Sequence, residues 1–195
     1  MDGSCRHGLP VLDDSAPESR EKLITIKCSA RALRILTSVR ALREEPSCDG
    51  EISMKILLPV DGSPSSSRAV RYVIQHWGGK QAKRRVSFIL LHVDLPLPER
   101  VVRVLPAETR AIYHDDHSKL AARPARRALR KAGLDFEERH AVGDPGMFTV
   151  ALAAKQRCDL IAMGSHGRGA FLSAVLGSVV MKVLSRSKVP VLVVR

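Results

Sequence analysis

The sequence predicts an α/β domain in which helices cover both faces of an open, doubly wound parallel sheet. Three observations predict it: short apolar runs typical of strands buried on both faces, amphipathic segments of helical length between these runs, and Gly, Pro or Asp residues at the junctions. Strands that alternate with helices form parallel βαβ units within one sheet. We therefore expect a single five-stranded sheet.

The five expected strands all lie after residue 53, and in chain order they are Ile56–Val60, Val86–Val93, Phe136–Val142, Leu160–Met163 and Val189–Val194. The first run, Ile-Leu-Leu-Pro-Val, is continuous rather than alternating, as expected of a strand that is buried on both faces. Hydrophobic residues make up 45% of the chain but aromatic residues only 4%, so the core must be built from Val, Leu, Ile and Ala.

Helices are expected after each of the first four strands, over Ser65–His76, Ala107–Ala132, Pro145–Arg157 and Gly177–Ser185. Pro124 lies inside the second of these, where a proline removes a backbone hydrogen bond and should kink or divide the helix. The third helix has a strong start signal, because Asp144 is a good N-cap residue and a proline follows it in the first turn.

Residues 1–53 differ from the rest of the chain and are expected to form an extension to a domain that spans residues 54–195. The extension contains one amphipathic stretch, Leu23–Leu42, between polar segments that bear Gly and Pro. A single helix cannot enclose a core, so we expect the extension to be disordered or a loosely docked helix. Met54 directly precedes the first strand, which makes it a candidate for the native start of the protein.

The charge distribution limits the classes of partner. Residues 54–195 contain 24 Lys and Arg but only 11 Asp and Glu. A basic domain can bind nucleic acid, but the chain lacks aromatic-interleaved basic strands and helix-turn-helix or zinc-finger spacing, so phosphate-bearing small molecules are the favoured partners. The four cysteines include no C-x-x-C pair, which argues against a zinc site or a disulfide framework. No apolar run approaches the roughly 20 residues that cross a bilayer, and we expect a cytoplasmic protein.

The strongest chemical signal is a glycine pattern at the end of the fourth strand. Gly164 is followed after two residues by Gly167 and after nine more by Gly177 and Ser178. Glycines allow a backbone to approach a ligand closely, and the N-terminus of the last helix favours phosphate groups. The pattern is neither a Walker A loop nor the G-x-G-x-x-G of dinucleotide-binding proteins. A tight strand-to-helix turn would use the same first glycines, but the distant Gly177 and Ser178 favour a phosphate site.

Asp61 follows the first strand, and it would face the glycine pattern if the first and fourth strands are neighbours. Ligands of open parallel sheets bind beyond the carboxyl ends of the strands, where the strand order reverses. The alternative role for Asp61 is an N-cap of the first helix, which is compatible with ligand contact. The sequence is compatible with both roles.

Other polar clusters favour structural roles. The run His114-Asp115-Asp116-His117 resembles a metal cluster, but consecutive residues point around a helix, and we interpret it as a solvated helix face. His92 is expected to pack in or near the sheet, and Cys158 to be a buried small hydrophobic residue. No nucleophile–base pair or carboxylate dyad is visible, which argues against efficient catalysis.

At the two strand ends the chain resembles the universal stress protein family of ATP-binding proteins. The resemblance is carried by four segments in the proper order, and it covers residues 54–195: Ile56–Ser63, Asp159–Gly169, Leu176–Val179 and Val189–Val194. It implies a Rossmann-like sheet with strand order 3-2-1-4-5. It also implies a nucleotide-dependent module in stress response or signalling.

The resemblance implies a set of residues around ATP, with Asp61 near the ribose and Val93 at the adenine. Mg²⁺ is expected to bind through the phosphates, with no dedicated metal ligands from the protein. One departure is Val180, which stands where ATP-binding members often carry a hydroxyl residue. The implied site residues are Pro59, Val60, Asp61, Val93, Met163, Gly164, Ser165, His166, Gly167, Arg168, Gly177, Ser178, Val179 and Val180.

The last strand provides a partner prediction. If Val189–Val194 lies at the sheet edge, its backbone can pair with another strand. The resemblance implies antiparallel pairing with the same strand of a second subunit, and hence a homodimer. Two alternatives to an ATP-binding module remain: a dimeric interaction module that binds no nucleotide, and a slow ATPase. Any enzymatic activity is expected to be at most slow ATP hydrolysis or autophosphorylation.

Overall fold

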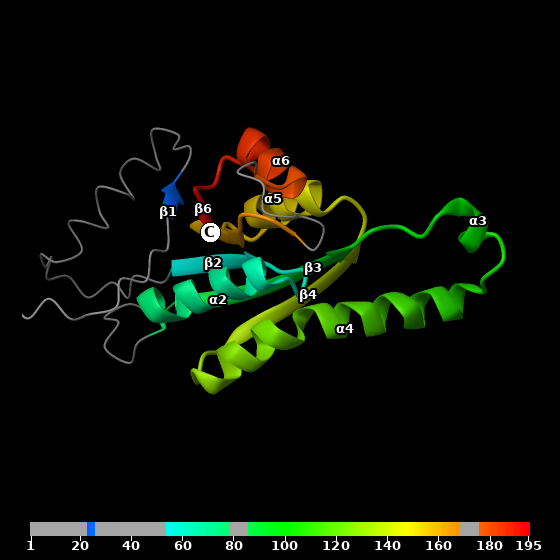
Figure 1. Cartoon of the computed structure of the whole chain (residues 1–195), viewed down its shortest axis with the longest axis horizontal. Helices are drawn as coiled ribbons and strands as arrows, with labels where there is room; N and C mark the ends of the chain where they lie inside the picture. Colours follow the sequence, from blue (N-terminus) through cyan, green and yellow to red (C-terminus); the bar gives the residue numbers. More distant parts are fainter. Residues whose placement is uncertain (1–22, 26–53, 79–85, 168–175) are drawn as a thin grey trace, which may run out of the picture.

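The computed structural model describes residues 23–25, 54–78, 86–167 and 176–195, the first of these ranges by its backbone alone. Five strands form the parallel part of the sheet: β2 (Met54–Pro59), β3 (Val86–Asp94), β4 (Phe136–Val142), β5 (Leu160–Gly164) and β6 (Val191–Val194). Their order across the sheet is β4-β3-β2-β5-β6 (Figure 1), and all four neighbouring pairs are parallel. The predicted order 3-2-1-4-5 is confirmed.

Helices cover both faces of this sheet (Figure 1). One face carries α2 (Pro64–Trp77) and α4 (Ala107–Lys131), and the other carries α5 (Pro145–Lys155) and α6 (Ser178–Arg186). The short helix α3 (Glu99–Val102) lies on the connection between β3 and α4, which extends away from the sheet. No helix in the described part of the chain combines the length and apolarity needed to cross a membrane.

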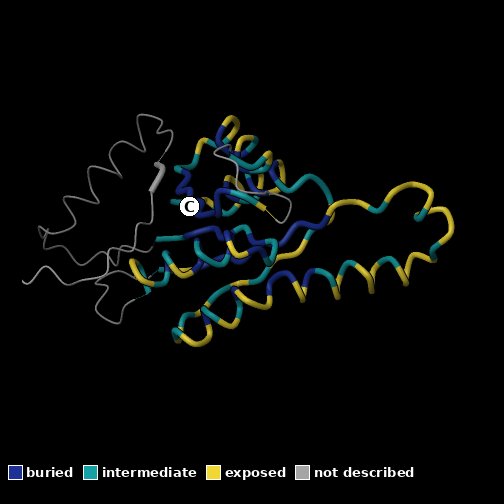
Figure 2. The backbone as a smooth tube through the Cα atoms, viewed as in Figure 1, coloured by how far each residue is buried: buried dark blue, intermediate teal, exposed yellow. Residues whose placement is uncertain are grey.

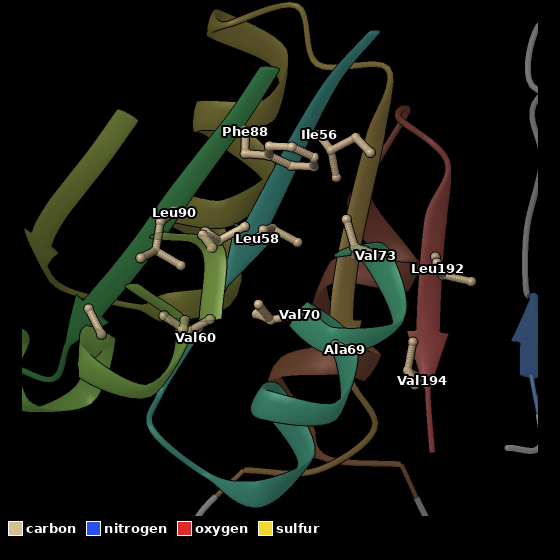
Figure 3. Close-up of a cluster of buried hydrophobic side chains, with 14 residues drawn as sticks. Ile56, Leu58, Val60, Ala69, Val70, Val73, Phe88, Leu90, Leu192 and Val194 are labelled. Atoms are coloured by element: carbon tan, nitrogen blue, oxygen red, sulfur yellow. The ribbon is translucent and has the colours of Figure 1, made fainter. Parts of the chain in front are cut away.

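The core is divided into two layers by the sheet, because successive side chains of a strand point to opposite faces. In β2, Ile56 and Leu58 pack toward α2 and α4, whereas Leu57 packs toward α5 and α6. Figure 3 shows the first layer, which contains Phe88 and Leu90 of β3 and Val70 and Val73 of α2 among others. In Figure 2 the central strands are the most continuously buried part of the molecule. Cys158 is buried in the second layer, as predicted.

The starts of two helices follow from local chemistry. The Ser63 hydroxyl accepts a hydrogen bond from the Ser66 amide at 3.1 Å and caps α2. The Asp144 carboxylate accepts from the Met147 amide at 2.9 Å and caps α5, which confirms the predicted N-cap. Both helices carry a proline in the first turn, where its missing amide hydrogen costs no helical hydrogen bond.

Pro124 does not divide the second predicted helix, because α4 runs unbroken over 25 residues. An interior proline costs about 3 kcal/mol in an isolated helix. Here the face that bears Ala121, Ala125 and Leu129 is buried against the sheet. Packing of this face offsets the loss, which is a tertiary effect that the local sequence does not reveal.

The structure adds a sixth strand to the edge of the sheet. Strand β1 (Leu23–Thr25) pairs antiparallel with β6, with Ile24 opposite Val193. The helix expected from residue 23 is therefore wrong for these three residues, and the remainder of that stretch lies outside the described residues. The strand also corrects the picture of β6 as an open edge, because its outer side is occupied by β1.

A partly buried ion pair joins α4 to the edge strand β4 and makes stability depend on pH. The Arg126 Nε donates to Glu138 Oε2 at 2.9 Å, and its Nη2 also contacts the same carboxylate. The two side chains are only 21% and 22% exposed. The hydrogen bond from the Arg126 guanidinium holds the pKa of Glu138 below its ordinary value, against the opposing effect of burial.

We expect Glu138→Gln to lower the free energy of unfolding near neutral pH by about 1 kcal/mol, after allowance for partial exposure. Because the folded pKa is lowered, the stabilisation is present above the unfolded value and is lost as pH falls through the folded value. The difference between the wild type and the variant should therefore shrink below about pH 4. Urea unfolding at several pH values measures it. Glu137→Gln is the control, because its pair with Arg139 is about half exposed, and an equal effect in both variants would contradict the prediction.

Candidate functional site

The first and fourth parallel strands, β2 and β5, lie side by side at the point where the strand order reverses. Ile56 is paired with Leu160, and Leu57 with Ile161. The chain leaves β2 toward one face of the sheet through α2 and reaches β5 from the other face through α5. The carboxyl ends of β2, β3 and β5 therefore border one crevice, as expected for a ligand site in this class of sheet.

A cavity of about 600 Å³ lies at this edge. This volume is within the range of small-molecule sites. Residues from β2, β3, β5 and the start of α6 line it together. Those predicted from the sequence are Pro59, Val60, Asp61, Val93, Met163, Gly164, His166, Gly167, Gly177, Ser178, Val179 and Val180.

Two residues of the predicted set stand apart. Ser165 is buried rather than among the lining residues, and its backbone links the surrounding elements. Its amide donates to the Val194 carbonyl at 2.9 Å, and its carbonyl accepts from the Gly177 amide at 2.9 Å. Ser165 thereby holds the two glycine segments together. Arg168 lies outside the described residues.

The glycines act here through close approach and not through a special backbone conformation. Among the described glycines a positive φ occurs at Gly62, Gly133 and Gly143, and thus at none of those in the site. A Cβ atom at Gly167 would lie 3.0 Å from Asp61 Oδ2. A Cβ at Gly164 would lie 2.5 Å from the Ser65 carbonyl carbon. Gly167 keeps the cavity open, whereas Gly164 allows α2 to pack against β5.

Asp61 faces the second glycine of the pattern, as expected if β2 and β5 are neighbours. Its Oδ1 accepts from the Ser63 amide at 3.0 Å, which fixes the carboxylate beside the turn. Its Oδ2 would lie 3.0 Å from a Cβ atom at Gly167, the closest contact that this Cβ would make with a non-adjacent residue in the described part of the chain. The N-cap of α2 is Ser63 and not Asp61, so the alternative role of Asp61 as a helix cap is wrong.

The N-terminus of α6 opens toward the cavity. Gly177 is its N-cap and forms no side-chain cap hydrogen bond, and Ser178, Val179 and Val180 of the first turn line the cavity. The first amides of an α-helix have no acceptor within the helix and carry the positive end of its dipole. This end of the cavity is therefore suited to an anionic group.

The sequence reasoning missed a histidine–aspartate cluster in the opposite wall. His92 and Asp94 of β3 and His117 of α4 also line the cavity. Asp94 Oδ2 accepts a hydrogen bond from His114 Nδ1 at 2.6 Å, and its Oδ1 accepts from His117 Nδ1 at 2.8 Å. The interpretation of residues 114–117 as a solvated helix face is wrong for both histidines, which are three residues apart and turn inward together.

A weak signal for this cluster exists in the sequence. His92 and Asp94 are two residues apart in a strand, so they share a face of the sheet. His114 and His117 share a face of the next long helix. The prediction that His92 packs in the sheet is confirmed, since it is buried and its Nδ1 lies 2.8 Å from the Val60 carbonyl oxygen.

Asp94 is held in its ionised form despite its burial. Burial raises the pKa of its carboxyl group, but the hydrogen bond from His114 and the interactions with His117 outweigh this effect, so the pKa lies below its ordinary value. A buried carboxylate that accepts two imidazole hydrogen bonds is a site of concentrated charge in an otherwise apolar wall.

Comparison of the sequence with known proteins finds relatives among the universal stress proteins. Universal stress protein Rv1636 of Mycobacterium tuberculosis is 33% identical over 147 residues, which cover 71% of this chain and 94% of that protein. Universal stress protein Rv1996 of the same organism is 28% identical over 160 residues, covering 80% of this chain and 49% of that protein. The chain spans about half the length of several of the curated relatives that it matches.

Solved structures show the same similarity. The hypothetical protein MJ0577 is 28% identical, with a TM-score of 0.62 over 72% of this chain and 94% of that chain. A universal stress protein crystallised in complex with cAMP is 30% identical, with a TM-score of 0.53 over 73% of this chain and 97% of that chain.

The sequence also matches the model of a protein family over most of its length. The model that matches residues 53–195 is that of the universal stress protein family. This range includes the whole parallel sheet, the cavity and the glycine pattern. The chain belongs to the universal stress protein family.

Proposed function

We propose that the chain binds an adenine nucleotide, ATP with Mg²⁺, in the cavity between β2, β3, β5 and α6, and that nucleotide occupancy serves a stress-response signal. The observation that carries the proposal is the meeting of two features in one cavity. The N-terminus of α6, where Gly177 makes no side-chain cap hydrogen bond, lies beside the Gly167 segment, and the Asp61 carboxylate faces Gly167.

The phosphate end of the proposed site is formed by backbone groups. The hydrogen bond from the Gly177 amide to the Ser165 carbonyl brings the two glycine segments together. Amides of the first α6 turn would donate to phosphate oxygens, and the helix dipole would add to their attraction. The Ser178 hydroxyl would be a further donor. Val180 supplies no hydroxyl group, so its contribution would be limited to its backbone.

The base end of the proposed site is apolar. Leu91, Val93 and Met163 line it, from the two strands on either side of β2. A flat purine ring can be sandwiched among such side chains, while Asp61 is placed to accept hydrogen bonds from ribose hydroxyl groups. The cAMP complex of a relative supports an adenine nucleotide as the class of ligand.

Mg²⁺ would be held chiefly by phosphate oxygens. It prefers oxygen ligands in octahedral geometry, keeps several waters and commonly binds with nucleotide phosphates rather than in an all-protein cage. When bound, the ion would neutralise phosphate charge; the residues of this chain would orient the nucleotide.

Isothermal titration with ATP, AMP and cAMP, each with and without Mg²⁺, tests the proposal. We expect ATP to bind with 1:1 stoichiometry and to bind more weakly at high salt, because helix-dipole attraction is screened. Mass spectrometry of the purified protein should detect a retained adenine nucleotide. If none of the three nucleotides bound at millimolar concentration, the alternative of a nucleotide-free interaction module would replace this proposal.

Two finer predictions stay open. Slow ATP hydrolysis would appear as phosphate release over hours.

A homodimer through Val189–Val194 requires the outer side of β6, which β1 occupies here, so we propose that dimerisation is coupled to displacement of β1. Analytical ultracentrifugation of the full chain and of its Ile24→Pro variant, in which the β1 pairing is disrupted, tests this coupling. A monomeric mass for both proteins would contradict the proposed homodimer.

A further inference from the structure

A set of metal-ligating side chains converges in the wall of the cavity formed by the end of β3 and by α4. His92, Asp94 and His117 each offer one ligand atom, and these atoms lie within 4.8 Å of one another. Two of the residues are buried and the third is partly exposed. Tertiary packing of α4 against β3 brings these side chains together, since residue 117 is more than twenty positions from residues 92 and 94 in the sequence.

The hydrogen bond of His92 selects the ring nitrogen that can bind a metal ion. A backbone carbonyl can only accept a hydrogen bond, so the contact of 2.8 Å between His92 Nδ1 and the Val60 oxygen places the proton on Nδ1. In the neutral ring the lone pair is then on Nε2. Histidines that bind metals usually have this arrangement, in which the second nitrogen donates to a carbonyl or carboxylate oxygen that orients the ring.

The carboxylate has a similar outer partner. His114 Nδ1 donates to Asp94 Oδ2 at 2.6 Å, while the contact to His117 involves the other oxygen, Oδ1. His114 could therefore keep its hydrogen bond while Oδ1 turned to an ion. The side chain of His117 is 31% exposed, against 16% for His114 and 9% for Asp94, so His117 is the most exposed member of the cluster.

The donor set selects the class of cation. Two imidazole nitrogens and one carboxylate oxygen suit Zn²⁺ and its first-row neighbours, whereas Mg²⁺ and Ca²⁺ prefer oxygen ligands alone. Zinc–nitrogen and zinc–oxygen bonds are about 2.0–2.2 Å long, so ligand atoms within 4.8 Å of one another are close enough to share one ion after small side-chain rotations. A fourth position would be open to water or to a group in the cavity.

We propose that His92, Asp94 and His117 bind a divalent transition-metal cation of the zinc class, with His114 as an outer residue that positions the Asp94 carboxylate. The site is distinct from the proposed Mg²⁺ position, which depends on phosphate oxygens beside α6. It requires no nucleotide, so it can be tested independently of the proposed function.

The test is a calorimetric titration of the full chain with Zn²⁺ in nucleotide-free buffer, after removal of metals with a chelator. Because thiolates also bind zinc, Cys5, Cys28 and Cys48 are replaced by Ser in all samples. We expect one Zn²⁺ per chain, retained in the presence of excess Mg²⁺. His114→Ala should weaken zinc binding by about 10- to 100-fold, as is usual for outer-shell partners. His117→Ala and Asp94→Asn should weaken it further.

Matched controls separate this site from other histidines. His76→Ala and His140→Ala, at exposed positions outside the cavity, should bind zinc as the parent does. His117→Ala is the decisive variant, because His117 is partly exposed and its replacement is less damaging to the fold than replacement of the buried His92. Far-UV circular dichroism checks that this variant is folded. Absence of zinc binding in the parent, or equal binding by the parent, His117→Ala and Asp94→Asn, would overturn the proposal.

Discussion

Gly164→Ala should lower the free energy of unfolding by about 3 kcal/mol, at the upper end of the usual cost of overpacking. A Cβ atom at this position would lie 2.5 Å from the carbonyl carbon of Ser65, and 2.6 Å from both its carbonyl oxygen and its hydroxyl oxygen. Two of these atoms belong to the backbone, in the first turn of α2. The clash cannot be relieved by rotation of a side chain, so α2 must move away from β5.

The consequence reaches beyond one contact, because α2 covers the strands that border the cavity. Ala69, Val70 and Val73 of α2 are fully buried in the first core layer. A shift of the helix would loosen this layer. For a domain of this size, the predicted change corresponds to a decrease of about 6–12 °C in the melting temperature.

Urea unfolding monitored by fluorescence measures this effect. The chain has a single tryptophan, Trp77, at the end of α2, and it packs against the first core layer. Gly177→Ala is the matched control: its Cβ would approach the nearest atoms, Cα of His166 and the Ser165 carbonyl oxygen, no closer than 3.4 Å, an ordinary contact. We expect the control to change stability by less than about 1 kcal/mol. Equal losses in both variants would refute the packing argument.

Gly167→Val should weaken adenine-nucleotide binding by about 10- to 100-fold while the domain remains folded. Among the described residues, apart from the chain neighbours, the one atom that a Cβ would approach within 4 Å is Asp61 Oδ2, at 3.0 Å, which is the end of a flexible side chain. The fold can therefore accommodate the substitution. The valine methyl groups would then occupy the cavity between Asp61 and the glycine segment, where the proposal puts the ribose and phosphates. A clash of about 1.4–2.8 kcal/mol gives this range of affinity.

A graded series makes this prediction specific. Gly167→Ala adds only the Cβ atom, so its affinity for ATP should lie between those of the wild type and Gly167→Val. Isothermal titration measures all three proteins, and thermal unfolding should give similar melting temperatures for each. Unchanged ATP affinity in Gly167→Val, with the fold intact, would exclude the site between β2 and α6.

The strands and most helix starts could be predicted because they depend on local patterns. A short continuous apolar run such as Ile56–Val60, bounded by turn residues, is typical of a strand that is buried on both faces, and the Asp144 N-cap and Pro145 act within one helical turn. The relation of Asp61 to Gly167 also followed, since both come directly after parallel strands whose carboxyl ends must share an edge. The family signature made the order of those strands predictable.

Several features could not be predicted because they depend on contacts between distant residues. The continuity of α4 through Pro124 results from packing of its buried face, which outweighs a local propensity. The role of Ser165 is a backbone one: its amide and carbonyl connect β6 to the start of α6, and its side-chain type gave no indication of this. The pairing of Leu23–Thr25 with β6 joins segments about 170 residues apart.

Local periodicity was thus sufficient to identify the strands. The glycine spacing was sufficient to predict a phosphate site at the start of the last helix. The convergence of His92, Asp94 and His117, the shape of the cavity and the strand that covers β6 emerged only in three dimensions. The physical reason is the range of the interactions. Hydrogen bonds within a turn and the alternation of side chains along a strand depend only on residues that are close in the sequence. Contacts between a strand end and a helix more than twenty residues later depend on how the layers pack.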